Sequence, residues 1–200
     1  MISYERDGDL WIVTINRPEK AGALSRKMLG DLADIVENAT TCKALILTGT
    51  GKVFSAGADL DEAYAGLATD PLWERVSSAV AAVPGLTIAA LNGTVAGGAF
   101  GMTLACDLRI AVPGAQFFYP VMRLGFRPPP SDPKRLKALI GPSRAKMILT
   151  AGQRISAQQA ADWGLIDRMV PKDIVQEAKL LAKDALNAEL SHINGIKQMI

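Results

Sequence analysis

Two glycine–alanine stretches contain the residues whose types and spacing could support chemistry. They are Phe54–Leu60 and Leu91–Gly101. Glycine and alanine leave backbone N–H groups uncovered, and the first turn of a helix has N–H groups without intrahelical partners. Such groups can bind a carboxylate, a phosphate, or an oxygen that gains negative charge during a reaction. A glycine-rich turn by itself is equally consistent with tight packing.

Both stretches follow apolar runs of strand length, Ala44–Thr48 and Leu86–Leu91. Continuous apolar runs of this length are typical of strands buried on both faces. Strands alternate along the chain with helical patterns, which indicates an α/β architecture. Further strands are predicted at Trp11–Ile15, Asp107–Val112 and Gln116–Tyr119. Helices are predicted at about 25–38 with Ser25 as N-cap, 71–83, 132–140, 142–150, 156–163 with Ser156 as N-cap, and 171–188.

Composition narrows the classes of function. A chain of 200 residues suits one domain, so residues 1–200 are predicted to form a single unit. A net charge of +2 gives no case for nucleic-acid binding. No apolar run reaches the ~18 residues that a membrane span needs, and no leader is apparent, so a cytoplasmic protein is expected. Cys42 and Cys106 are too few and too isolated for a disulfide framework, and no metal site is expected.

Several motifs occur together, and in order, from about Trp11 to Ala182. The two glycine–alanine stretches are joined by Asn16–Glu19, Cys106–Arg109, Ala115–Phe117, Leu149–Ala157 and Ala160–Asp167. This set resembles the crotonase superfamily, also called the enoyl-CoA hydratase/isomerase family. The resemblance implies a ClpP/crotonase-like fold, which is a spiral of ββα units. It also implies a homotrimer, or a hexamer made of two trimers.

The same resemblance implies that an acyl-CoA thioester binds in a bent form, with coenzyme A as part of the substrate and no permanently bound cofactor. Two backbone N–H groups would hold the thioester oxygen, and the matching positions here are Ala58 and Gly98. Arg17 and Lys20 are expected either to contact phosphates or to be ordinary solvated charges. The residues expected to line the adenine end of coenzyme A are Ala56, Gly57, Ala58, Asp59 and Leu60.

The chain departs from the pattern where the resemblance places acids and bases. Hydratases of the family carry glutamates at the positions of Gly101 and Val121, and some isomerases and dehalogenases carry an aspartate at the position of Pro129. None of these three side chains can transfer a proton, although such steps contribute about 10²–10⁴ in rate. Hydration by two carboxylates is therefore not expected.

Other residues near these positions could replace the missing groups. Tyr119 is either an acid/base group or a packed strand aromatic, and Asp132 is either an acid/base group or a helix cap. Arg123 and Arg127 could contact an acyl carboxylate or a phosphate, or could be surface charges. Glu62 could lean into the pocket or be solvated on a helix.

Two further departures weaken parts of the match. Gly22 stands where the family usually has asparagine, which affects the contacts expected from Lys20 to Ala23. Family members also continue past the position of Ile200 with helices that cover the coenzyme A site and lock the trimer, and these are expected to be largely missing from this chain.

Three hypotheses follow for the function. The first is an enzyme that stabilises an acyl-CoA enolate through Ala58 and Gly98 and catalyses isomerisation or decarboxylation rather than standard hydration. The second is a non-catalytic acyl-CoA-binding protein. The third is a structural partner in a mixed oligomer.

Overall fold

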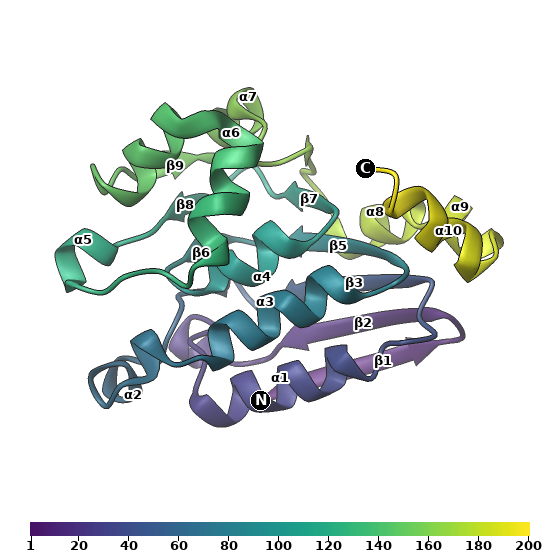
Figure 1. The fold of residues 1–200 in the computed structure, drawn as a ribbon, viewed down its shortest axis with the longest axis horizontal. Helices are drawn as coiled ribbons and strands as arrows, with labels where there is room; N and C mark the ends of the chain where they lie inside the picture. Colours follow the sequence, from purple (N-terminus) through teal and green to yellow (C-terminus); the bar gives the residue numbers. More distant parts are fainter.

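The structure is a computed structural model that describes residues 1–200, and it contains two β-sheets surrounded by helices (Figure 1). The larger sheet has the strand order β1-β2-β3-β5-β7-β10. In it β1 pairs antiparallel with β2, and the remaining pairs are parallel. Its strands are β1 (Ile2–Asp7), β2 (Leu10–Ile15), β3 (Ala44–Gly49), β5 (Leu86–Leu91), β7 (Leu108–Ala111) and β10 (Arg168–Met169).

The smaller sheet has the order β4-β6-β8-β9. Its strands are β4 (Val53–Ser55), β6 (Thr94–Ala96), β8 (Gln116–Phe118) and β9 (Ile155–Ser156). The strands β4, β6 and β8 run parallel, and β9 pairs antiparallel with β8. Three times in succession the chain passes from the larger sheet to the smaller sheet and then into helix, which gives the predicted ββα units.

Both faces of the larger sheet are buried. Successive side chains in a strand point to opposite faces, so the inner strands contribute residues to two separate cores. On one face, residues such as Leu45 and Leu91 join the main core, which also contains side chains from α1 (Arg26–Glu37), α3 (Leu72–Ala82) and α4 (Ala99–Ala105). On the other face, Ile46 and Ile88 pack with residues of α8 (Ile174–Leu181). This explains why β3 and β5 are apolar at nearly every position.

The two serine caps predicted from the sequence are confirmed. The Ser25 hydroxyl accepts a hydrogen bond from Met28 N at 3.2 Å and begins α1. Ser156 forms a capping box with Gln159 at the start of α7 (Ala157–Trp163). The two helices predicted at 132–140 and 142–150 form α6 (Ser131–Leu149), which is interrupted at Gly141 with φ 78°.

Other elements differ from the sequence prediction. The strands β1, β4, β6, β9 and β10 were not predicted, and α3 begins at Leu72, with Pro71 as its N-cap. The helix predicted at 171–188 is two helices in the structure: α8 begins after its cap Asp173, and a break at Ala182 separates it from a second, shorter helix. The remaining helices are α2 (Leu60–Tyr64), α5 (Val121–Leu124), α9 (Lys183–Asn187) and α10 (Leu190–Lys197), with short 3₁₀ turns at Pro18–Lys20 and Leu67–Thr69.

Figure 1 places α8–α10 at one end of the molecule and α2 and α5 at the other. None of the helices combines the length and the hydropathy that crossing a bilayer requires.

Candidate active site

The two glycine–alanine stretches predicted from the sequence meet in the structure. Their turns, which begin at Ala56 and Gly97, follow β4 and β6, and these strands are parallel neighbours in the smaller sheet. Gly57 has φ 92°, a backbone conformation that glycine adopts at no steric cost. A Cβ atom on Gly57 would lie 2.9 Å from the carbonyl oxygen of Ala96 and 3.4 Å from the backbone nitrogen of Gly98. The two turns are therefore in direct contact, and a side chain at position 57 would separate them.

Two backbone N–H groups at this contact have no partner in the protein. Those of Ala58 and Gly98 donate no hydrogen bond, whereas Asp59 N donates to Leu24 at 2.9 Å and Phe100 N donates to Gly97 at 3.0 Å. Gly98 precedes the first residue of α4, where N–H groups lack intrahelical acceptors. The site thus presents two unpaired donors from adjacent turns.

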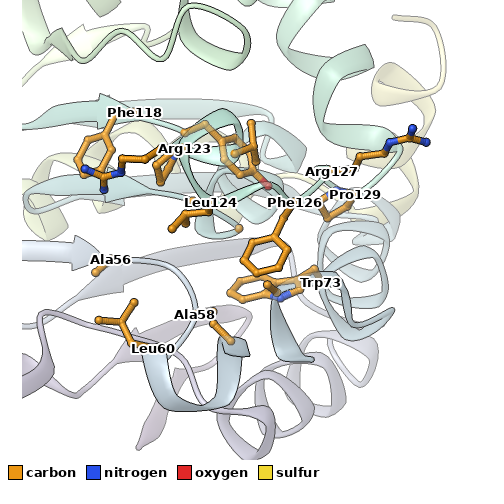
Figure 2. Close-up of a pocket in the computed structure, with 17 residues that line it drawn as sticks. Ala56, Ala58, Leu60, Trp73, Phe118, Arg123, Leu124, Phe126, Arg127 and Pro129 are labelled. Atoms are coloured by element: carbon orange, nitrogen blue, oxygen red, sulfur yellow. The ribbon is translucent and has the colours of Figure 1, made fainter. Parts of the chain in front are cut away.

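Ala58 and Gly98 both line a mostly apolar cavity of about 190 Å³ (Figure 2). The wall beside Gly98 is the indole of Trp73, since a Cβ atom on Gly98 would lie 2.8 Å from that ring. Trp73 Nε1 donates to the carbonyl oxygen of Leu67 at 2.8 Å, which fixes the ring. Further lining residues come from β8 and the segment after it, among them Phe118, Tyr119, Leu124 and Phe126.

The residues predicted to contact coenzyme A divide into two groups. Ala56, Ala58 and Leu60 line the cavity. Asp59 does not, because its carboxylate pairs with Arg17 at 2.8 Å and caps α2 by accepting from Asp61 N at 3.2 Å. Lys20 is exposed and forms no ion pair. Burial disfavours the charge on Asp59, but the hydrogen bond and positive charge of Arg17, together with the backbone N–H groups of Glu62 and Asp61, outweigh it and hold the pKa of that carboxyl below its usual value.

Replacing Asp59 with alanine is expected to lower the free energy of unfolding by about 1 kcal/mol, because the cap of α2 and the ion pair to Arg17 are lost together. Urea unfolding would measure the change. Lys20→Ala is the control, since an exposed and unpaired side chain contributes within about 0.5 kcal/mol. Equal unfolding midpoints for the two variants would contradict the prediction.

Tyr119 and Asp132, the two acid/base candidates, are brought together as a buried pair. Tyr119 follows β8, and Asp132 is the second residue of α6. The Tyr119 hydroxyl donates to Oδ2 of Asp132 at 2.9 Å, and the ring of Phe100 lies 5.5 Å from the Tyr119 ring, centroid to centroid. Asp132 is only 1% exposed and Tyr119 only 4%. The helix-cap alternative for Asp132 is wrong, because its carboxyl accepts from Tyr119 and from no backbone N–H.

The carboxyl of Asp132 fills space that Gly101 leaves open. A Cβ atom on Gly101 would lie 2.7 Å from Oδ1 of Asp132, so the chain cannot carry both groups without a shift. Oδ1 is buried and has no hydrogen-bond partner. The sequence singled out Gly101 as a departure from the family pattern and Asp132 as a possible acid/base group, but separately. Val121 and Pro129, the other two departures, line the cavity and are apolar.

Burial sets the protonation of the pair. It raises the pKa of Asp132 to about 7; the negative charge of Glu74 adds to the rise, while the hydrogen bond from Tyr119 and the positive charge of Arg135 oppose it. Burial also raises the pKa of the Tyr119 phenol well above its usual range, so the phenol keeps its proton. The pair therefore contains a permanent donor and a carboxyl that changes charge near neutral pH, which is the range suited to acid–base catalysis.

The remaining charged candidates lie at the periphery. Arg123 and Arg127 line the cavity but are exposed, and Figure 2 shows them on opposite sides of it. Glu62 accepts a hydrogen bond from Arg26 N at 2.7 Å, at the start of α1. The carboxylate of Glu62 is therefore occupied by the backbone of a neighbouring helix.

Comparisons with known proteins all point to the same protein family. A family model described as enoyl-CoA hydratase/isomerase matches residues 5–200. A short-chain-enoyl-CoA hydratase of Clostridium acetobutylicum is 34% identical over 209 residues, covering 100% of this chain and 80% of that protein. A 4-chlorobenzoyl coenzyme A dehalogenase-2 of an Arthrobacter species is 30% identical over 207 residues, covering 98% of this chain and 75% of that protein.

Solved structures share the same fold. The crystal structure of an enoyl-CoA hydratase from Bacillus anthracis is similar with a TM-score of 0.90 and 32% sequence identity, covering 98% of this chain and 81% of that one. The predicted ClpP/crotonase-like fold is thereby confirmed.

Proposed function

This chain belongs to the enoyl-CoA hydratase/isomerase family, and we propose that it binds an acyl-CoA thioester in the apolar cavity and stabilises the enolate of that thioester. The observation that supports this most directly is the pair of unpaired N–H groups of Ala58 and Gly98. An oxygen that becomes negatively charged is stabilised by donors that are already in place, and each such donor contributes roughly 2.7–4 kcal/mol.

The proposed reaction is an isomerisation or a decarboxylation rather than standard hydration. Hydration needs one group to activate water and another to protonate carbon, and the side chains of Gly101, Val121 and Pro129 can do neither. Isomerisation moves one proton between two carbons of the same acyl group, and decarboxylation needs enolate stabilisation and one proton donor. Both demands fit a cavity that combines two N–H donors with a single buried proton-holding pair, Tyr119 and Asp132.

Coenzyme A enters this scheme as part of the substrate. Ala58 would hold the thioester oxygen, and the cavity walls at Ala56 and Leu60 would line the adenine end of coenzyme A. A homotrimer, or a hexamer of two trimers, remains the proposed assembly, and size-exclusion mass of the purified chain tests it. A monomer that elutes alone would contradict it.

The test of the function is calorimetric titration with crotonyl-CoA, followed on the same sample by the absorbance of the conjugated thioester. We expect binding without loss of that absorbance, because hydration needs two separate acid/base groups and the cavity has a single proton-holding pair. With 3-butenoyl-CoA the absorbance should appear if the double bond is moved, and with malonyl-CoA carbon dioxide should be released if the enolate forms by decarboxylation. Free coenzyme A is the control ligand, since it lacks the thioester carbonyl.

Each result separates the hypotheses. Loss of crotonyl-CoA absorbance would contradict the exclusion of hydration. Binding of crotonyl-CoA with no reaction of either further thioester would leave a non-catalytic acyl-CoA-binding protein. No binding of any thioester would overturn the proposed function and favour a structural role in a mixed oligomer.

A further inference from the structure

We propose that Tyr119 and Asp132 form a proton relay, in which Tyr119 exchanges a proton with the acyl group in the cavity and Asp132 acts through Tyr119. This inference rests on the proposed function, because the proton that moves is that of a bound acyl-CoA. It adds a path for that proton, which the two backbone donors cannot provide.

The first step of the argument is the position of Tyr119. It lines the cavity, and its hydroxyl has a single partner, Oδ2 of Asp132. The other hydrogen-bond donors among the lining side chains have no buried ionisable partner. Trp73 donates to the carbonyl oxygen of Leu67, and Arg123 and Arg127 are exposed. Tyr119 is thus the lining side chain that connects the cavity to a buried ionisable group.

The second step is the position of the carboxyl. Gly98 and Gly101 are three residues apart at the start of α4, so they face the same side of the helix. The unpaired N–H of Gly98 borders the cavity, and the carboxyl of Asp132 lies against Gly101, one turn further along. The relay is therefore next to the site where the thioester oxygen is proposed to bind.

The third step is the chemistry of a buried carboxyl with a free oxygen. An unpartnered polar atom in a protein interior costs free energy, so its retention calls for a specific reason. The charged groups around Asp132 are Glu74 from α3 and Arg135 from α6, which act in opposite directions, while α4 contains no charged residue and contacts Asp132 at Gly101. Burial dominates this balance and places the change of charge near neutral pH.

The proton transfer balances without any further reactant. When the C–H bond next to the thioester breaks, its electron pair forms the enolate held by Ala58 and Gly98. The proton goes to the oxygen of Tyr119 while the phenolic proton crosses the 2.9 Å hydrogen bond to Oδ2 of Asp132. Asp132 becomes neutral and Tyr119 is unchanged. The reverse movement returns a proton to the same carbon or to another carbon of the acyl group.

The test is deuterium incorporation into butyryl-CoA in D₂O, followed by the mass of the thioester. Tyr119→Phe and Asp132→Asn are each expected to slow incorporation about 10²-fold or more. Because the two groups act in series, the double variant should be no slower than the slower single variant. Asp162→Asn is the matched control, the same change at an exposed carboxylate on α7.

The pH profile separates a relay from a merely structural role. The active form of Asp132 is the ionised one, so the wild-type rate should rise as pH passes through about 7 and then level off. In Asp132→Asn this rise should be absent. Calorimetry with butyryl-CoA should give affinities within about threefold of wild type for all variants.

Several outcomes would overturn the relay and leave the proposed function standing. They are wild-type binding without deuterium incorporation, a Tyr119→Phe rate equal to wild type, or a rise near pH 7 that persists in Asp132→Asn. Failure of the wild-type protein to bind butyryl-CoA would instead count against the proposed function, and the relay would fall with it.

Discussion

Replacing Gly57 with alanine is expected to slow deuterium incorporation into butyryl-CoA about 10²–10³-fold, the loss seen when one oxyanion donor is removed. The new Cβ atom would lie 2.9 Å from the carbonyl oxygen of Ala96 and 3.4 Å from the nitrogen of Gly98. Relief of this contact must move the two turns apart. The N–H groups of Ala58 and Gly98 would then be unable to hold one oxygen together, as we propose that they do.

The control for this prediction is Gly152→Ala. Gly152 has φ 64° and no atom within 4 Å of its ideal Cβ position. Alanine at this position therefore has the strain of a left-handed backbone but no steric contact of the kind expected at position 57. Both variants should lose roughly 1–2 kcal/mol of stability from that strain. Only Gly57→Ala should lose exchange, and a Gly57→Ala protein that exchanges at the wild-type rate would contradict the convergence of the two donors.

A second large effect is expected in the pH dependence of stability. The folded protein keeps the proton of Asp132 up to a pKa of about 7, while an unfolded aspartate has its ordinary value of 3.8. Between these values the folded state binds more protons, so the free energy of unfolding falls as pH rises from about 4 to 7. One unit of pKa difference corresponds to about 1.36 kcal/mol, which gives a loss on the order of 4 kcal/mol.

Asp132→Asn removes this titration. The free energy of unfolding of Asp132→Asn minus that of wild type should therefore rise by on the order of 4 kcal/mol between pH 4 and pH 8, because only the wild type loses stability over this range. Urea unfolding at several pH values measures the difference. Asp162→Asn, an exposed change, should follow the wild-type curve, and parallel curves for wild type and Asp132→Asn would contradict the burial of an ionisable carboxyl at this position.

The elements that the sequence predicted well are those whose signals are local. Ser25 and Ser156 cap helices with hydroxyls that reach backbone groups three residues away, and β3 and β5 are apolar along nearly their whole length. The strands β4 and β6 have three residues each and depend on pairing with distant segments, so no local period marks them. The edge strand β1 is mostly exposed and has no apolar pattern to reveal it.

The site was predictable in part for the same reason. Ala58 and Gly98 follow from motifs that occur in order along the chain. The contact between Tyr119 and Asp132 does not, because twelve residues with a short helix and three consecutive prolines separate them. Only packing of α6 against α4 places the carboxyl beside Gly101, and no sequence spacing encodes that packing.

The indole of Trp73 in the cavity wall places an intrinsic fluorophore at the site. Trp73 is in contact with Gly98, whereas Trp11 lies in the larger sheet beneath the guanidinium of Arg6, and Trp163 ends α7 near Arg144. Of the three tryptophans in the chain, only Trp73 lines the cavity. If the proposed acyl-CoA binds there, Trp73 emission should change with occupancy, and the filling of the cavity can be followed in real time without a label.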